Sequence, residues 1–211
     1  MLISPNHEPT LSPPYPRYGV LASGSGSNFE ALIHAQARGA LLGELGCLIC
    51  NNPGAGAIRR AQDHGIPAHC INHRDFDSRV SFDHAIIQAL DSHKIDWVVM
   101  AGWMRIVSKD FIEAFDSRVL NIHPSLLPSF KGAHAVEDAL TAGVKITGCT
   151  VHMVIADLDA GPIIAQAAVP ILADDDARSL HARIQEQEHA LYPRAIMMAV
   201  DAYHQSHSSS R

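Results

Sequence analysis

The sequence has no long hydrophobic run, no secretory signal and no cluster of positive charge, and each absence excludes a class of protein. No apolar stretch approaches the roughly 18 residues that a membrane-spanning helix needs. The N-terminus lacks a basic start followed by an apolar segment, so a secretory signal is not expected. The net charge is −6 and no run of Lys or Arg is present, which disfavours nucleic acid as a partner. We therefore expect a soluble protein, outside the membrane, that binds small molecules.

Cysteine is scarce, and its spacing argues against a metal site. The four cysteines are Cys47, Cys50, Cys70 and Cys149, and the first two form a C-x-x-C that could mark a metal or redox site. Residues three apart on a strand point to opposite faces, however, and no second C-x-x-C follows. The 14 histidines form no His-Glu-x-x-His motif. These patterns predict free thiols in a reducing compartment, the cytoplasm, and no bound metal.

Length and composition indicate one globular domain. A chain of 211 residues with 47% hydrophobic and 18% charged residues can bury a full core. Residues 1–16 contain five prolines and predict a disordered arm. The Ser- and His-rich residues 204–211 predict a flexible tail. The domain is therefore expected to span residues 17–203.

Strand and helix patterns alternate along the chain, which predicts an α/β fold with a Rossmann-like, doubly wound sheet. The N-terminal half is expected to be parallel. Residues 146–155 and 163–169 alternate and flank a turn-rich loop, so they predict an antiparallel pair in the C-terminal half. A long helix is expected over 175–203. The other strands are predicted at 18–22, 45–50, 68–71, 97–101 and 119–122.

A glycine-rich turn, Ser23–Asn28, joins the first of these strands to a helix. Strand, glycine-rich turn and helix can present backbone N–H groups and a helix N-terminus to a phosphate, although a plain tight turn has the same pattern. Phe29 stands where the dinucleotide fingerprint needs its third glycine, and the strand at 45–50 is followed by no acid for a ribose. The turn therefore favours a single phosphate over a nicotinamide cofactor.

Polar residues gather near strand ends in the second half of the chain. Asn121 and His123 are two apart on one strand, so they face the same way, and Pro124 ends that strand. His152 and Asp159 follow. A histidine beside a carboxylate can move protons and an amide can stabilise an oxyanion, which suits acyl transfer. No G-x-S-x-G elbow supplies a nucleophile, so the attacking group would come from the substrate.

Each of these residues also has an ordinary structural interpretation. His123 alone could be a satisfied histidine at a strand end, and Asp159 could simply form the turn before Gly161. The sequence motifs themselves carry a further indication. The segments 121–128 (NIHPSLLP), 148–152 (GCTVH) and 159–162 (DAGP) resemble the folate-dependent formyltransferases in order and spacing. The resemblance extends from Ser23 to His189 and is closest to the members that formylate glycinamide ribonucleotide (GAR).

The resemblance implies a reaction and a catalytic trio. The amine of GAR would attack the formyl group of 10-formyltetrahydrofolate, giving formyl-GAR and tetrahydrofolate in de novo purine biosynthesis. Asn121 would stabilise the tetrahedral oxyanion, and His123 would transfer protons and assist that stabilisation. Asp159 would orient and charge His123 or relay protons through water. GAR and the folate co-substrate are the implied partners, with no metal, in a monomer or homodimer.

The resemblance also implies binding residues for both substrates. Arg79 matches a position near the glutamate tail of the folate, although a solvated helix arginine is an equal alternative. Ala160 stands where this loop often has glycine. The implied GAR contacts are Gly24, Ser25, Gly26, Ser27, Asn28, Gln185 and Glu188. The implied folate contacts are Arg79, Met104, Arg105, Ile106, Val107, Ile155, Ala156, Asp157 and Asp159.

Three alternatives remain from the sequence. A formyltetrahydrofolate deformylase shares the domain and the trio but uses water and has a regulatory domain, for which 16 preceding residues are too few. A methionyl-tRNA formyltransferase needs a further domain and a basic surface, which this acidic chain does not offer. A non-catalytic phosphosugar or folate binder would have no need of an oxyanion donor beside a proton carrier.

Overall fold

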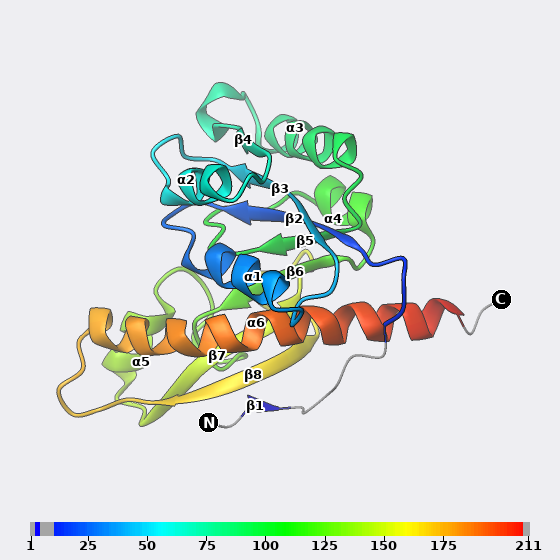
Figure 1. The fold of residues 1–211 in the computed structure, drawn as a ribbon. Coiled ribbons are helices and arrows are strands. Elements are labelled where there is room, and N and C mark those ends of the chain that lie inside the picture. Colours follow the sequence, from blue (N-terminus) through cyan, green and yellow to red (C-terminus); the bar gives the residue numbers. More distant parts are fainter. Residues whose placement is uncertain (1–2, 5–10, 209–211) are drawn as a thin grey trace.

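The chain folds around one twisted sheet with helices on both faces (Figure 1). The computed structural model describes residues 3–4 and 11–208. In that part of the chain the sheet has eight strands in the order β1-β8-β7-β6-β5-β2-β3-β4. The strands are β1 (Ile3–Ser4), β2 (Arg17–Ala22), β3 (Glu44–Cys50), β4 (Ala68–Cys70), β5 (Trp97–Met100), β6 (Val119–His123), β7 (Ile146–Met153) and β8 (Ile163–Pro170). The helices are α1 (Ser27–Ala37), α2 (Gly56–Asp63), the 3-10 helix η1 (His73–Asp75), α3 (Arg79–Ser92), α4 (Lys109–Phe115), α5 (Ala135–Ala142) and α6 (Ala177–Ser208).

The sheet has the two parts that the sequence predicts. Strands β2 to β6 are parallel, whereas β7 runs antiparallel to both β6 and β8. The prediction of a Rossmann-like α/β sheet with an antiparallel C-terminal part is thus confirmed. Strand β2 lies between β3 and β5, so the direction of winding reverses there. Open α/β sheets bind ligands in the crevice outside the carboxyl ends of the strands at such a reversal.

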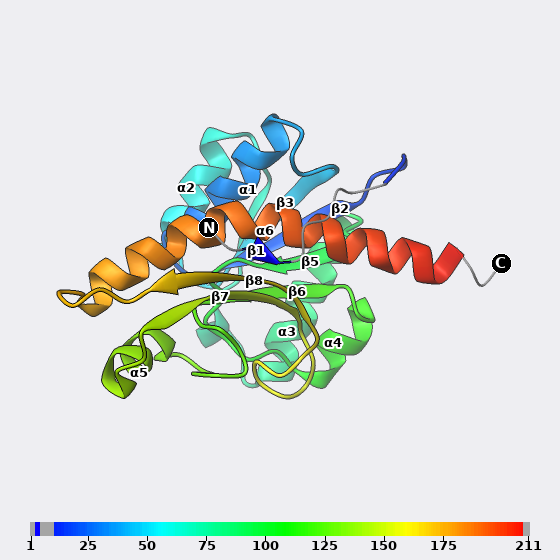
Figure 2. The same ribbon diagram turned by 90° about the horizontal axis from the view of Figure 1, so that it is seen from below.

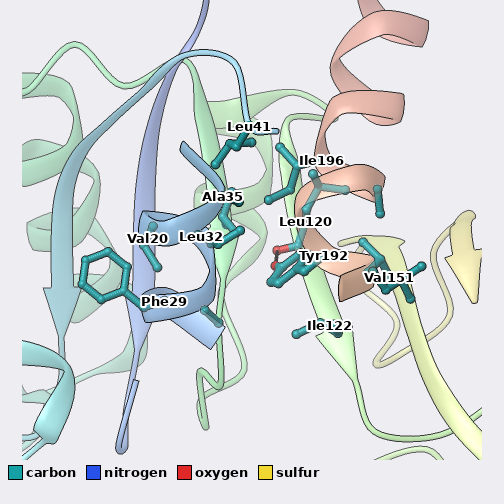
Figure 3. Packing of buried hydrophobic residues seen from close by; sticks show 14 of the residues in the cluster. Val20, Phe29, Leu32, Ala35, Leu41, Leu120, Ile122, Val151, Tyr192 and Ile196 are labelled. Atoms are coloured by element: carbon teal, nitrogen blue, oxygen red, sulfur yellow. Dashed lines mark hydrogen bonds between the residues drawn. The ribbon is translucent and has the colours of Figure 1, made fainter. Parts of the chain in front are cut away.

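Two helical layers enclose the sheet. Helices α1, α2 and α6 cover one face, and α3 and α4 cover the other (Figure 2). Figure 3 shows that the side chains of Leu120 and Ile122 of β6 lie on the side of the sheet that α1 and α6 cover, close to Tyr192. Because successive side chains of a strand alternate between its faces, Asn121 and His123 must point to the opposite side. The apolar packing of β6 therefore decides which way its polar residues face.

Tyr192 links α6 to the centre of the sheet. Its side chain is fully buried, and its hydroxyl lies 2.8 Å from the Met100 carbonyl oxygen and 3.3 Å from that of Leu120. These two carbonyls belong to the neighbouring strands β5 and β6. Burial raises the pKa of Tyr192 well above its usual value, with the Glu188 carboxylate as a smaller cause, so the hydroxyl stays protonated and can donate.

The expected disordered arm is partly held by the domain. Residues 1–2 and 5–10 lie outside the described residues. Of the remainder, Ile3 and Ser4 pair with Ala167 and Gln166 of β8, which otherwise forms an edge. The Pro16 carbonyl accepts a hydrogen bond from the Glu44 N–H at 3.0 Å. These parts of the arm are therefore held in place, because backbone groups of β8 and β3 form hydrogen bonds with them.

The expected flexible tail begins as a helix. Helix α6 continues through Pro193 to Ser208, five positions beyond the predicted end at Tyr203. The His207 ring stacks on that of Tyr203 with centroids 4.0 Å apart, and its Nδ1 lies 2.8 Å from the Tyr203 carbonyl oxygen. This contact extends the helix into a Ser- and His-rich segment. Residues 209–211 lie outside the described residues. No described helix combines the length and apolar character needed to cross a bilayer.

Replacing Tyr192 with phenylalanine should weaken the fold. We expect Tyr192→Phe to lower the free energy of unfolding by about 1 kcal/mol, because two buried carbonyl groups lose a shared donor. Urea unfolding followed by circular dichroism measures this change. Tyr15→Phe is the control, since Tyr15 is 41% exposed and its change should stay within about 0.5 kcal/mol. Equal losses in both variants would contradict the role of the Tyr192 hydroxyl.

Candidate active site

The buried carboxylate of Asp159 lies between two histidines. One oxygen is 3.5 Å from His123 Nδ1 and the other is 3.6 Å from His152 Nε2. All three side chains are almost completely enclosed, with exposed fractions of 3 to 6%. A carboxylate removed from water needs polar partners around it, and here two imidazole rings face it. The structure therefore brings the predicted pair His123 and Asp159 together and adds His152 to it.

Asn121 bonds to His152 across the sheet. The two residues are opposite each other in the β6–β7 pairing, and Asn121 Nδ2 lies 3.2 Å from His152 Nε2. Burial lowers the pKa of His152, which favours the neutral ring. Its Nδ1 lies 2.9 Å from the Met153 carbonyl oxygen, so Nδ1 carries the proton and Nε2 can accept from the Asn121 amide. The third predicted residue thus joins the same cluster.

The loop after β7 carries Asp159 back over the sheet. Asp159 has a positive φ of 47°, a conformation that aspartate tolerates better than most residues. Its Oδ2 accepts the Gly132 N–H at 2.9 Å, which ties this loop to the one that follows β6. At Gly161 a Cβ would lie only 1.9 Å from the Met153 carbonyl oxygen, so the return of the loop requires glycine. Ala160, where glycine was noted as common, is exposed.

His123 makes a second contact in the same loop after β6. Its Nε2 lies 2.8 Å from the Phe130 carbonyl oxygen. A carbonyl can only accept, so Nε2 carries a proton and Nδ1 is the nitrogen that faces Asp159. Phe130 has a positive φ of 53°, and the Ser125 hydroxyl donates to the same carbonyl at 3.2 Å. The loop thus holds the imidazole in one orientation.

The glycine-rich turn lies at the point where the sheet reverses its winding. The Ser23 N–H donates to the Gly102 carbonyl at 3.0 Å, which joins the ends of β2 and β5. Gly26 is the N-cap of α1 with φ of 78°, and a Cβ there would lie 2.7 Å from the Ala57 Cα. Gly24 and Ser25 complete the turn, and a Cβ at Gly24 would meet nothing within 4 Å. Ser27 and Asn28 begin the helix, so their N–H groups point toward the turn.

Glu188 of α6 lies against the start of α1. The Asn28 Nδ2 donates to Glu188 Oε2 at 2.7 Å, and both side chains are buried. Burial raises the pKa of Glu188, and the hydrogen bond from Asn28 lowers it by less. Gln185 is half-buried and precedes Glu188 by three positions, so both lie on one side of α6. Among the residues predicted to contact GAR, Gly24–Asn28 and Glu188 therefore lie together at the N-terminus of α1, and Gln185 lies three positions before Glu188 on α6.

The segment 104–107, predicted to contact the folate, leaves β5 beside this turn. The Met104 N–H donates to the Ser23 hydroxyl at 2.9 Å. Met104 and Ile106 are 72% and 55% exposed, which is unusual for large apolar side chains. Arg105 is exposed, whereas Val107 is buried against the layer of α3 and α4. Two exposed apolar side chains therefore flank the exposed Arg105 in this segment.

The other predicted folate wall, residues 155–159, is also exposed up to its last residue. Ile155 and Leu158 are 40% and 52% exposed, and Ala156 and Asp157 are exposed as well. Val154, at the base of this loop, packs on the same apolar cluster as Val107. Two loops with exposed apolar side chains thus rise from one cluster, an arrangement suited to a flat apolar ligand.

Arg79 is exposed at the first position of α3. One turn later, Asp83 accepts the Ser108 N–H at 2.5 Å, which holds the start of α3 beside the segment 104–107. Arg79 therefore lies at the outer side of the predicted folate region. Burial raises the pKa of Asp83, and the bonds from Ser108 lower it by less.

Some site groups were not predicted. His152 was one of the gathered polar residues, but its pairing with Asn121 depends on the alignment of β6 with β7, which the sequence pattern does not reveal. The Phe130 carbonyl and the Gly132 N–H are backbone groups with no sequence signal of their own.

Within the described ranges, no group of three or more His, Cys, Asp or Glu residues is placed to hold a metal ion. Cys47, Cys50, Cys70 and Cys149 are free thiols.

Comparison with known proteins places this site in a family context. The family described as Formyl transferase matches residues 17–196. Phosphoribosylglycinamide formyltransferase of Escherichia coli (strain K12) is 40% identical over 191 residues, which cover 90% of each chain. The human trifunctional purine biosynthetic protein adenosine-3 is 44% identical over 182 residues, covering 86% of this chain and 18% of that protein. The chain therefore spans about a fifth of the length of this trifunctional relative.

Comparison with solved structures leads to the same family. The crystal structure of phosphoribosylglycinamide formyltransferase from Bacillus halodurans has a TM-score of 0.84 at 43% identity, covering 86% of this chain and 93% of that one. Glycinamide ribonucleotide transformylase 1 from Symbiobacterium toebii has a TM-score of 0.87 at 41% identity and 90% coverage of both chains. Because the family match spans residues 17–196 and both sequence and structure agree with these relatives, the chain belongs to the formyl transferase family.

Proposed function

We propose that the protein transfers the formyl group of 10-formyltetrahydrofolate to the amine of GAR, giving formyl-GAR and tetrahydrofolate in purine biosynthesis. The observation that carries this proposal is the buried cluster of Asn121, His123, His152 and Asp159. It combines an amide donor, two imidazoles and a carboxylate, and it contains no Ser, Thr, Cys or Lys nucleophile. The names of the relatives support the same reaction.

In the proposed reaction the GAR amine attacks the formyl carbon directly. The formyl oxygen gains negative charge, and the Asn121 amide and a protonated His123 stabilise it. Asp159 orients the His123 ring, since its carboxylate faces Nδ1 at 3.5 Å. The amine loses a proton and N10 of the folate gains one as the carbon–nitrogen bond breaks. His123 and Asp159 are the groups that carry this proton, directly or through water.

Asn121 and His123 each make a contact in the structure that bears on how they reach the substrates. The Asn121 amide donates to His152 Nε2, and the Nε2–H of His123 donates to the Phe130 carbonyl. The single Nε2–H of His123 has to leave its acceptor to bind an oxyanion, whereas the Asn121 amide has a second N–H to offer. Because both acceptors are neutral, a developing negative charge competes favourably for the same hydrogens. The donors are therefore already protonated and positioned but not yet engaged.

We assign the two substrates to two different groups of residues beyond this cluster. We assign the GAR phosphate to the N–H groups of Gly24–Asn28, where the dipole of α1 favours an anion. Gln185 and Glu188 are assigned to the ribose. The folate ring is assigned to the backbone of 104–107 and to the loop 155–159, with Arg79 near its glutamate tail. The proposal includes no metal and a cytoplasmic location.

A direct assay tests this function. With GAR and 10-formyltetrahydrofolate, we expect formyl-GAR and tetrahydrofolate to form in equal amounts, measured by chromatography and by folate absorbance. Omitting GAR is the control and should abolish tetrahydrofolate formation. Release of formate and tetrahydrofolate without any amine product would replace transfer by hydrolysis, the reaction of a deformylase. Binding of both ligands with no product would indicate a binding protein.

Substitutions in the cluster should lower turnover more than binding. We expect His123→Ala and Asp159→Asn to reduce kcat by about 10²- to 10⁴-fold, the usual effect of losing a proton carrier or an electrostatic partner. Dissociation constants for both substrates, from calorimetry, should change little. His84→Ala and Asp63→Asn are matched controls on exposed ion pairs and should keep normal kcat. Near-normal turnover of His123→Ala would require a different base.

The two substrate regions should respond separately to substitution. Glu188→Gln keeps the shape of the side chain but removes a strong acceptor, so KM for GAR should rise about tenfold with little change in KM for the folate. Met104→Ala should have the opposite pattern, because it removes exposed apolar surface from the assigned folate wall. Initial rates with one substrate varied at a time measure both constants. Equal changes for both substrates in either variant would contradict the assignment.

A further inference from the structure

Two free cysteines face each other at the edge of the sheet. In the parallel pairing of β3 and β4, Cys50 is directly opposite Cys70. Opposite residues of neighbouring strands point to the same face, and Ala68, two positions before Cys70, packs on the same cluster as Leu48, two positions before Cys50. Strands lie about 4.8 Å apart, which is within the Cα separation that a disulfide spans.

The two thiols differ in environment. Cys70 is exposed on the edge strand, whereas Cys50 is fully buried. The Cys50 thiol donates to the Asn52 carbonyl at 3.2 Å. Burial raises the pKa of Cys50, and the neighbouring Cys70 thiolate adds to this. Cys70 is therefore the residue that meets a soluble oxidant first, and Cys50 is placed to resolve the product.

We propose that Cys50 and Cys70 form a reversible disulfide when the protein meets hydrogen peroxide. The Cys70 thiolate attacks one peroxide oxygen, the O–O bond breaks, and water leaves, so Cys70 becomes a sulfenic acid. The Cys50 sulfur then attacks the Cys70 sulfur, loses its proton and expels a second water. Two thiols are oxidised and one peroxide is reduced to two waters. An exposed partner makes the bond accessible to thiol reductants.

The disulfide would act on the phosphate turn. Cys50 is opposite Ala22 at the end of β2, directly before the turn Ser23–Asn28. The Asn52 carbonyl that accepts the Cys50 thiol also accepts the Ala55 N–H at 3.1 Å, and so helps to start α2. The Ala57 N–H in turn donates to the Gly24 carbonyl at 3.2 Å.

The phosphate turn and the start of α2 are tightly packed. A Cβ at Gly26 would lie 2.7 Å from the Ala57 Cα, so the turn and the start of α2 are in close contact. Disulfide formation removes the thiol donor to Asn52 and pulls the end of β3 toward β4. We then expect the turn to bind a phosphate with lower affinity. This consequence rests on the proposed function, whereas formation of the disulfide does not.

Thiol counting tests the disulfide. The full chain is treated with hydrogen peroxide, quenched with catalase, denatured and labelled with N-ethylmaleimide, and its intact mass is measured. We expect four labels before oxidation and two after it, a linked peptide containing Cys50 and Cys70, and full recovery with dithiothreitol. Cys70→Ser should keep all its remaining labels under mild oxidation. Cys149→Ser, the control, should still lose two.

Several results would overturn the disulfide. Four labels after oxidation, a disulfide-linked dimer through Cys70, or a Cys70 oxidised only to sulfinic acid would each do so. Loss of two labels that involves Cys47 or Cys149 would also contradict the pairing. None of these results depends on enzyme activity, so a failure of the proposed function leaves this measurement decisive.

Kinetics test the effect on the phosphate turn. In the oxidised protein we expect KM for GAR to rise by about two- to tenfold, the effect of losing one hydrogen bond, with KM for the folate unchanged. Cys70→Ser should be insensitive to peroxide in this assay. A confirmed disulfide with an unchanged KM for GAR would overturn the coupling alone. An equal rise for both substrates would indicate general damage rather than an effect on the turn.

Discussion

The burial of the Asp159 carboxylate is the constraint on which the site depends. A carboxylate that leaves water needs polar partners, and Asp159 accepts the Gly132 N–H and faces the rings of His123 and His152. These partners come from two segments, the end of β6 with its following loop and strand β7, while Asp159 itself lies in the loop after β7. The positive φ of Asp159 and the glycine at 161 let the chain deliver the carboxylate there. One buried charge thus holds together segments that are separate in sequence.

The apolar core determines where the polar residues go. In β6, Leu120 and Ile122 pack on the layer of α1 and α6, so Asn121 and His123 are left on the other face. In β7, Cys149 and Val151 pack on that same layer, which turns His152 toward Asn121. A shift of β7 by one residue would move His152 to the apolar side. The geometry of the candidate site is therefore a consequence of core packing on the opposite face.

Much of this could be predicted from the sequence, and the reasons for the rest are physical. Local patterns can be recognised in a single sequence. They include the alternation of strands and helices, the glycine-rich turn, and the pair Asn121 and His123. The alignment of β6 with β7 depends on packing between distant residues, so the contact of Asn121 with His152 was not predictable. The helix beyond Tyr203 and the pairing of Ile3 and Ser4 with β8 depend on tertiary contacts as well.

The two substrate regions share backbone contacts, which has a consequence for how they act together. The Ser23 N–H binds the Gly102 carbonyl, and the Ser23 hydroxyl accepts the Met104 N–H. The turn assigned to the phosphate and the segment assigned to the folate are thus hydrogen-bonded to each other at one residue. When a ligand orders one region, the other region therefore loses less conformational entropy on binding its own ligand. Such a link favours a complex with both substrates bound, the state from which direct transfer can proceed.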